Sequence, residues 1–206
     1  GIWMNTQRPE WNDANNALVG NGVSMVTLNY LNRFLKFGID LFGKLGDVEI
    51  SINKPVSDLL DALHRGLKVR THLLETGFDD VERRKLMDRF GIAGEHYRHS
   101  AYAGFYGERV KVNAQEIVAF FKLAKQFLTQ TIEGNQREDG LYHSYNLISF
   151  GTETAHVEHL YEMLEGQVAV MSAKHLDAEE SLRVLDALKS SDMFRADQYS
   201  YMLYPD

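Results

Sequence analysis

The sequence predicts an all-α fold, and three observations support this class. Apolar residues recur at three- and four-residue spacing over most of the 206-residue chain, which is the period of an amphipathic helix. Hydrophobic residues make up 44% of the chain, enough to build a core at this length. We find no internal repeat, low-complexity tract or sustained heptad pattern. We therefore expect a single helical domain over residues 1–206, with about six helices joined by loops.

The first helices follow from this spacing. One is expected over residues 23–42, where apolar residues recur until glycines break the pattern. Residues 48–52 alternate apolar and polar side chains, so they can form a brief strand, although no partner is evident. A second helix is expected over residues 56–74, directly after Pro55.

A charge-rich segment begins at Asp79 and Asp80. Acids at its start and bases after them suit the dipole of a helix. Gly91 and Gly94 are expected to interrupt this helix, and the residues 95–106 that follow are ambiguous between helix and loop.

Three more helices are expected over residues 117–132, 154–171 and 177–188. The first and third are preceded by capping-box patterns that start at Asn113 and Asp177, each with a glutamate three residues later.

Composition excludes several classes of function. The chain has no cysteine, which rules out disulfides, thiolate metal sites and a cysteine nucleophile. A formal charge of −7 argues against binding to nucleic acid. No apolar run approaches the roughly 20 residues that span a bilayer, and the first residues lack the pattern of a signal peptide. We expect no nucleic-acid or membrane partner and favour a cytoplasmic location.

One segment near the N-terminus has no helical or strand period and carries a tryptophan among carboxylates and amides. An indole ring can pack on the C–H face of a sugar, while acids and amides bond its hydroxyl groups. The alternative is that the polar residues form turns and helix caps and that the tryptophan is buried. The candidate substrate-binding residues are Arg8, Trp11, Asn12, Asp13 and Asn16, beside the carboxylate of Glu10.

This segment resembles the catalytic loop of the cellobiose and chitobiose phosphorylase family. In that family an acid-Trp-Asn-Asp-Gly run precedes an Asn, a Val-Gly pair, further glycines and a helix that contains a serine. The matching residues here are Glu10-Trp11-Asn12-Asp13-Ala14, Asn16, Val19-Gly20, Gly22 and Ser24. The sequence departs from the pattern at two positions of the run, where Glu10 replaces an aspartate and Ala14 a glycine.

The resemblance implies an enzyme that cleaves a glycosidic bond of an oligosaccharide with inversion, with Glu10 as the general acid. A hydrolase also needs a carboxylate base, whereas a phosphorylase uses inorganic phosphate as co-substrate; neither needs another cofactor. Segments that resemble the family's phosphate site are not evident, which favours hydrolysis. The alternative is a non-catalytic helical domain that binds sugar or a protein partner.

The family's fold is a toroid of six α-helical hairpins, which needs roughly 300 residues or more. The resemblance therefore implies a partial toroid, with chain missing on the N-terminal side and on the C-terminal side as well. Such a piece is expected either to self-associate through an exposed apolar face or to have an incomplete cleft with little activity alone.

A second candidate region covers residues 137–146, where aromatic and hydrogen-bonding side chains alternate. Tyr142, His143 and Tyr145 can form part of a sugar subsite, and Asp139 or its neighbour Glu138 can serve as the base. The alternative is a turn at residues 139–140 with the tyrosines packed on helices.

Glu153, near the start of an expected helix, is another candidate base. His156 and His159 lie three residues apart nearby, but no third ligand is evident, so no metal site is expected.

Overall fold

The computed structural model describes residues 1–4, 18, 20–104 and 107–205, and it has a mixed α/β fold. A four-stranded sheet and two two-stranded sheets accompany the helices, so the all-α prediction is wrong. The toroid of helical hairpins implied by the resemblance is wrong for the same reason, because that architecture has no place for a four-stranded sheet.

The chain divides into two compact units. The first comprises residues 1–33, 128–150 and 156–206, and the second comprises residues 34–127 and 151–155. Helices α2 (Met25–Gly43) and α6 (Ala114–Glu133) contribute residues to both units.

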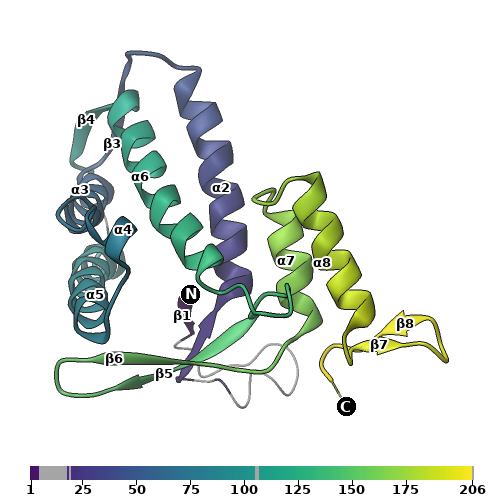
Figure 1. The fold of residues 1–206 in the computed structure, drawn as a ribbon. Helices are drawn as coiled ribbons and strands as arrows, with labels where there is room; N and C mark the ends of the chain where they lie inside the picture. The colour runs from purple at the N-terminus through teal and green to yellow at the C-terminus, as the bar shows by residue number, and fades with distance from the viewer. Residues whose placement is uncertain (5–17, 19, 105–106, 206) are drawn as a thin grey trace. The chain divides into compact units, whose positions relative to one another are not determined.

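The first unit contains the four-stranded sheet, the helices α7 and α8, and a small C-terminal hairpin (Figure 1). Its elements are β1 (Ile2–Met4), β2 (Gly22–Ser24), β5 (Tyr145–Phe150), β6 (Ala155–His159), α7 (Leu164–Ser172), α8 (Ala178–Ser190), β7 (Phe194–Arg195) and β8 (Ser200–Tyr201). The strand order is β1-β2-β5-β6, and both β1 and β5 pair with β2 in the antiparallel sense.

The two faces of this sheet differ in chemistry because successive side chains on a strand point to opposite sides. Tyr145 and Leu147 of β5 pack into an apolar cluster with Leu18 and Met163. Asn146, between them, lies opposite Val23 in the register and belongs to the other face. The face of Tyr145 and Leu147 therefore packs into this cluster, and the other face carries the buried Asn146 together with the apolar Val23 and Ile148.

A second apolar cluster in the first unit brings together helices that lie far apart in the sequence. Met25 and Leu28 from the start of α2 pack with Ile132 from the end of α6. Val170 of α7 and Val184 of α8 complete this contact. The capping box expected at Asp177 is confirmed: its side chain accepts from the Glu180 N–H, and the Glu180 carboxylate accepts from the Asp177 N–H.

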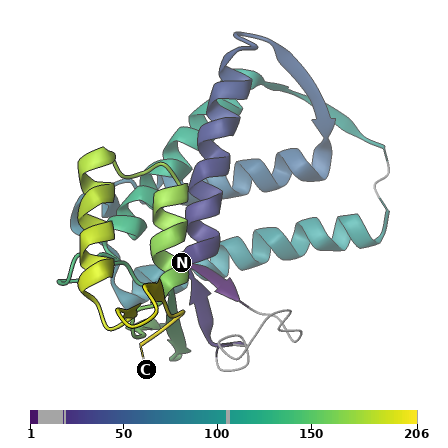
Figure 2. The same ribbon diagram turned by 90° about the vertical axis from the view of Figure 1, so that its right-hand side faces the viewer.

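The second unit is built from helices and one strand pair. Its elements are β3 (Glu49–Asn53), α3 (Lys54–Lys68), α4 (Leu73–Thr76), α5 (Asp80–Tyr102) and β4 (Arg109–Asn113). Helices α3 and α5 lie side by side (Figure 2). They approach closely at Gly66, where an added Cβ would lie 2.9 Å from the ring of Phe90.

Residues 49–53 do form a strand, and its partner is β4, which begins more than fifty residues later. The expected break at Gly91 and Gly94 is wrong, because α5 continues through both glycines. Asp79 caps its start and accepts from the Glu82 N–H, and Arg84 pairs with Asp88 one turn later. These contacts offset the cost of about 1 kcal/mol that each interior glycine adds.

The helix expected over residues 154–171 is wrong in its first half. Residues 155–159 form β6, and α7 begins only at Leu164. Ala155 and Val157 alternate with polar residues, and this two-residue period is typical of a strand. The strand forms because its backbone pairs with β5. None of the helices in the described ranges is long and apolar enough to cross a membrane.

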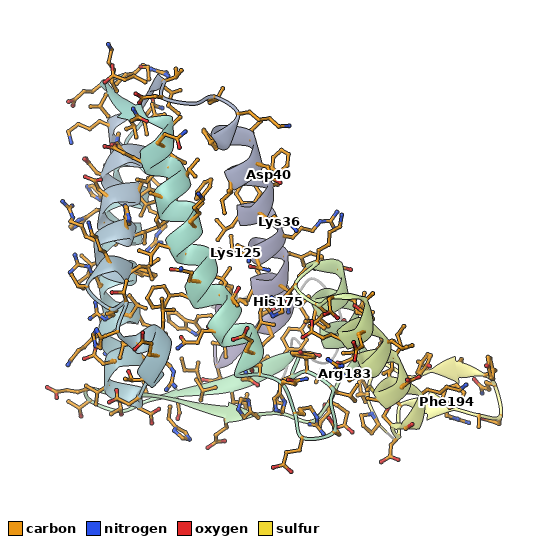
Figure 3. All side chains as sticks on the ribbon, turned by 45° about the horizontal axis from the view of Figure 1, so that its top comes forward. Lys36, Asp40, Lys125, His175, Arg183 and Phe194 are labelled. Atoms are coloured by element: carbon orange, nitrogen blue, oxygen red, sulfur yellow. The ribbon has the colours of Figure 1, made fainter. Side chains whose placement is uncertain are left out.

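The part of α2 in the second unit exposes an apolar stripe. Phe34, Phe37 and Leu41 follow helical spacing, and each has 47–60% of its surface exposed. Lys36 and Asp40 lie on the same helix (Figure 3). Aromatic rings of this size bury up to about 150–250 Å² each, so the stripe can support a weak contact between copies. Self-association therefore stays a prediction, and these residues are its best candidates.

Replacing Phe37 with Glu is expected to reduce self-association, because the carboxylate must be desolvated in any contact on the stripe. Sedimentation velocity over a wide range of protein concentration measures this. Ile92→Glu, at an exposed position on α5, is the matched control. Equal association of both variants and the wild type would exclude the stripe.

Candidate functional site

An open hollow in the first unit collects the polar side chains of the loop between α6 and β5. It has a volume of about 490 Å³, and its lining residues are Gln136, Arg137, Glu138, Asp139, His143 and His159. The first five come from the loop before β5, and His159 is the last residue of β6. The hollow therefore forms where the loop meets the sheet.

Arg137 organises the acidic side of the hollow. Its guanidinium donates to Asp139 at 2.8 Å and forms an ion pair with Glu162 at 3.0 Å. Asp139 also accepts from the backbone N–H of Leu141 at 3.0 Å. Burial alone would raise the pKa of Asp139, but the hydrogen bonds from Arg137 and Leu141 lower it overall. The same hydrogen bond to Asp139 raises the pKa of Arg137.

His143 and His159 stack on each other at the opposite side of the hollow. Their ring centroids are 4.2 Å apart, and the ring planes differ by only 6°. Nδ1 of His143 lies 2.9 Å from the carbonyl oxygen of Leu160, and Nδ1 of His159 lies 3.0 Å from Oδ1 of Asn146. Because a carbonyl oxygen can only accept, both Nδ1 atoms carry the proton and donate it.

A chain of amides sets the proton position on His159. The carbonyl of Thr131 accepts from Nδ2 of Asn135 at 2.7 Å, which leaves Oδ1 of Asn135 to accept from Nδ2 of Asn146 at 2.7 Å. Oδ1 of Asn146 is thereby turned toward His159. A backbone carbonyl at the end of α6 thus determines which nitrogen of His159 is protonated.

Both histidines favour the neutral state. Burial lowers the pKa of His143, and the neighbouring His159 and Arg137 lower it further, against smaller opposing effects of Leu160 and Asp139. Burial lowers the pKa of His159 as well, followed by the charge of Arg137. Two cationic rings at the stacking distance would also repel each other. The pair is therefore two neutral imidazoles at neutral pH.

The loop is held in place by Gln167, a fully buried residue of α7. Its Oε1 accepts from the N–H of Tyr142 at 2.8 Å, and its Nε2 donates to the carbonyl of Tyr142 at 2.7 Å and to that of Met163 at 2.9 Å. One side chain thus satisfies both backbone groups of Tyr142, as a neighbouring strand would.

Ser144 makes the next attachment. Its hydroxyl donates to the carbonyl of Met163 and accepts from the N–H of Gly166 at 2.7 Å, and its own carbonyl accepts from the N–H of Met25. A side chain at position 166 would collide with the Ser144 hydroxyl, so glycine is needed for this approach.

The residues proposed from sequence do not form one site among the described residues. Glu10 and the substrate-binding candidates Arg8, Trp11, Asn12, Asp13 and Asn16 lie outside the described residues. His143 and Asp139 line the hollow, but Tyr142 and Tyr145 between and beside them are buried. Glu153 lies in the exposed turn between β5 and β6, in the second unit.

The buried tyrosines have structural partners. Tyr142 packs in the apolar cluster with Leu141 and Val184. The hydroxyl of Tyr145 donates to Glu165 at 2.7 Å, and burial together with this carboxylate raises the pKa of the phenol. Neither ring offers a face to a ligand, so the site proposed below does not use them.

Sequence reasoning gave no site role to Asn146 or Gln167 and did not connect His159 with the region 137–146. It also gave no role to Trp3, whose exposed ring meets that of Phe150 edge-on at 5.5 Å on the same face of the sheet as Asn146. A polar residue at a helix position that is otherwise apolar, as at Gln167, is a signal that could have been found. The contact with His159 needs the pairing of β5 with β6.

Comparisons with known proteins give no further assignment. No model of a known protein family matches the chain, and a search of characterised proteins found no match. Within the described ranges, no group of three or more histidine, aspartate or glutamate side chains is placed to hold a metal ion.

Gln167→Leu is expected to destabilise the chain by about 3 kcal/mol, because both backbone groups of Tyr142 lose their partner while staying buried. Gln167→Glu should also destabilise it, since a carboxylate cannot donate to the Tyr142 carbonyl. Urea unfolding measures both, with Gln126→Leu at an exposed position of α6 as the control. A loss no larger than that of the control would contradict this role.

Stability is expected to fall as the pH falls through the ordinary histidine pKa of 6.5. The pKa of His143 is lowered on folding, so below 6.5 the unfolded chain binds the proton better than the folded one. His143→Gln should flatten this dependence, by less than about 1.4 kcal/mol per pH unit, the limit for one proton. Denaturant unfolding at several pH values tests this, with His96→Gln on the exposed side of α5 as the control.

Proposed function

We propose that the protein is a carbohydrate-active enzyme that cleaves a glycosidic bond by hydrolysis with inversion. The observation that carries the proposal is the run Glu10-Trp11-Asn12-Asp13 with the glycines that follow it. Glu10 is the general acid, which protonates the glycosidic oxygen as the bond breaks. The proposal rests on this run and on the hollow, and not on the fold of the enzymes that the run resembles.

The run connects two strands of the sheet that contains β5, and its flanking residues Met4 and Gly22 pair at the level of Leu147, on the side of Tyr145 away from His143. It lies between β1 and β2, which pair with each other in the antiparallel sense. Strand β2 also pairs with β5, whose Asn146 orients His159. Both strands that flank the run therefore belong to the sheet that carries the candidate site.

The charge of the hollow favours a neutral, hydroxyl-rich ligand over an anion. Three carboxylates, Glu138, Asp139 and Glu162, accompany one guanidinium, and the two histidines are neutral at neutral pH. The only cation in this group, Arg137, already binds two of the carboxylates. This arrangement favours water over phosphate as the nucleophile.

We assign the base to Glu138 in preference to Asp139. Both oxygens of Asp139 accept hydrogen bonds from Arg137, and its lowered pKa makes it a weak base. Glu138 lines the hollow and has no hydrogen-bond partner among the described residues. A carboxylate that activates water must have an oxygen free to take the proton.

The exposed rings of Trp3 and Phe150 give the same face of the sheet an apolar surface. Phe150 lies four residues beyond Asn146 on β5, about 14 Å along the strand. Aromatic faces of this kind pack on the C–H surfaces of sugars. This spacing suits an oligosaccharide that extends from the hollow.

The test is an assay of the chain on a panel of disaccharides and oligosaccharides, with and without phosphate. Glu10→Gln and Glu138→Gln are each expected to lower the rate by about 100-fold or more, the contribution of a general acid or base. Glu95→Gln, on the exposed side of α5, is the matched control. The first-formed anomer, followed by NMR, reports inversion.

Two outcomes would contradict this assignment. Cleavage that requires phosphate would make the enzyme a phosphorylase and remove the need for Glu138. Sugar binding without cleavage under any condition would favour the non-catalytic alternative.

A further inference from the structure

We propose that Nε2 of His143 and Nε2 of His159 form a paired acceptor for two adjacent hydroxyl groups of a neutral sugar ring. The inference deepens the proposed function, on which it rests, because it names the groups that select the sugar. It concerns binding and assigns neither histidine a catalytic step.

The first step is the assignment of the ring protons. Nδ1 of His143 donates to the Leu160 carbonyl, and Nδ1 of His159 donates to an amide oxygen fixed by the Asn146–Asn135 pair. A neutral imidazole carries only one proton, so each Nε2 has a lone pair and can only accept. Within the described part of the chain, neither Nε2 has a hydrogen-bond partner.

The second step is the placement of these two acceptors. Both rings line the hollow, and both Nδ1 atoms are turned to protein groups. Nε2 is joined to Nδ1 through Cε1, and its lone pair points away from the Nδ1–H bond, so Nε2 is the nitrogen left for a ligand. The stack keeps the rings parallel with centroids 4.2 Å apart. We infer that the two Nε2 atoms lie on the same edge of the stack, where hydroxyls on neighbouring carbons can each come within about 3 Å of one acceptor.

The third step is the exclusion of other ligands. An anion would meet two lone pairs and a surplus of carboxylates, since Arg137 is already paired with Asp139 and Glu162. A metal ion would need further ligands, and no group of three suitable side chains exists among the described residues. A neutral polyol supplies the donors that both the histidines and the carboxylates require.

The fourth step concerns the protonation state of the two histidines, which is consistent with their role as acceptors. The pKa of each histidine is lowered by burial and by Arg137, so both rings keep their lone pairs at neutral pH. Protonation turns both ring nitrogens into donors, which removes the acceptors. Asp139, Glu138 and Glu162 are the acidic groups of this cluster, and Arg137 is its basic group.

The first measurement needs no ligand and no activity. Two-bond ¹H–¹⁵N correlation spectra of the histidines report which ring nitrogen carries the proton. At about pH 7.5 both rings are expected to be neutral with the proton on Nδ1. A proton on Nε2 of either ring would overturn the inference, whatever the chain does to glycosides.

The second measurement is a titration with cellobiose, followed by the histidine ring signals. Binding is expected at about pH 7.5 and should weaken about tenfold or more at about pH 5, as the acceptors are lost. His143→Gln and His159→Gln should each weaken binding about tenfold, the loss of one hydrogen bond. His96→Gln should bind as the wild type does.

The remaining outcomes separate this inference from the proposed function. Binding at the histidines by a chain that cleaves nothing would support the paired acceptor and contradict the enzyme. Cleavage that depends on Glu10, with ring signals that saturating cellobiose does not move, would support the enzyme and overturn the paired acceptor. Binding that is unchanged at low pH would also overturn it.

Discussion

The candidate site depends on the contact that one buried amide makes with the backbone of Tyr142. Gln167 takes up the N–H and the C=O of that residue, so the loop after α6 is fixed to α7 without a strand pairing of its own. His143 and Ser144 follow directly and are tied to the Asn135 carbonyl and to Gly166. The three consecutive residues 142–144 thus each form hydrogen bonds to other parts of the unit, and these bonds fix the direction in which β5 begins.

This attachment explains how a loop can hold precise geometry. Loop residues are usually mobile because their backbone groups bond to water. Here the N–H of Tyr142 donates to Gln167 of α7, and within the loop the N–H of Leu141 donates to the side chain of Asp139. The side chains that line the hollow, Arg137 and Asp139 among them, therefore extend from a backbone that is fixed on both sides.

Local signals in the sequence were sufficient where neighbouring residues determine the structure. The cap at Asp177 and the periodicity of α2 predicted two helices within a few residues of their observed bounds. Local sequence patterns were insufficient where the structure of a segment depends on a partner far away in the sequence. Residues 49–53 found their partner in β4, and residues 155–159 became a strand because β5 pairs with them.

The candidate site shows the same division between local and distant contacts. A polar and aromatic segment at 137–146 was evident from sequence, and His143 and Asp139 do line the hollow. The tyrosines of that segment are buried because α8 and Glu165 of α7 provide partners that no local pattern reveals. The stacking of His143 on His159 requires the hairpin of β5 and β6, so sequence spacing alone could not bring these rings together.

Arg137 links the two halves of the hollow through its charge. Its hydrogen bonds lower the pKa of Asp139, and its charge also lowers the pKa of His143 and of His159, both of which burial already lowers. These effects act in the same direction, since the carboxylate of Asp139 and the two imidazoles then present lone pairs and carry no added proton. A ligand that satisfies them must bring hydrogen-bond donors, and a neutral sugar brings many without carrying a charge that must be desolvated. The chemistry of the hollow thus follows from one guanidinium whose own hydrogen bonds are taken up by the protein.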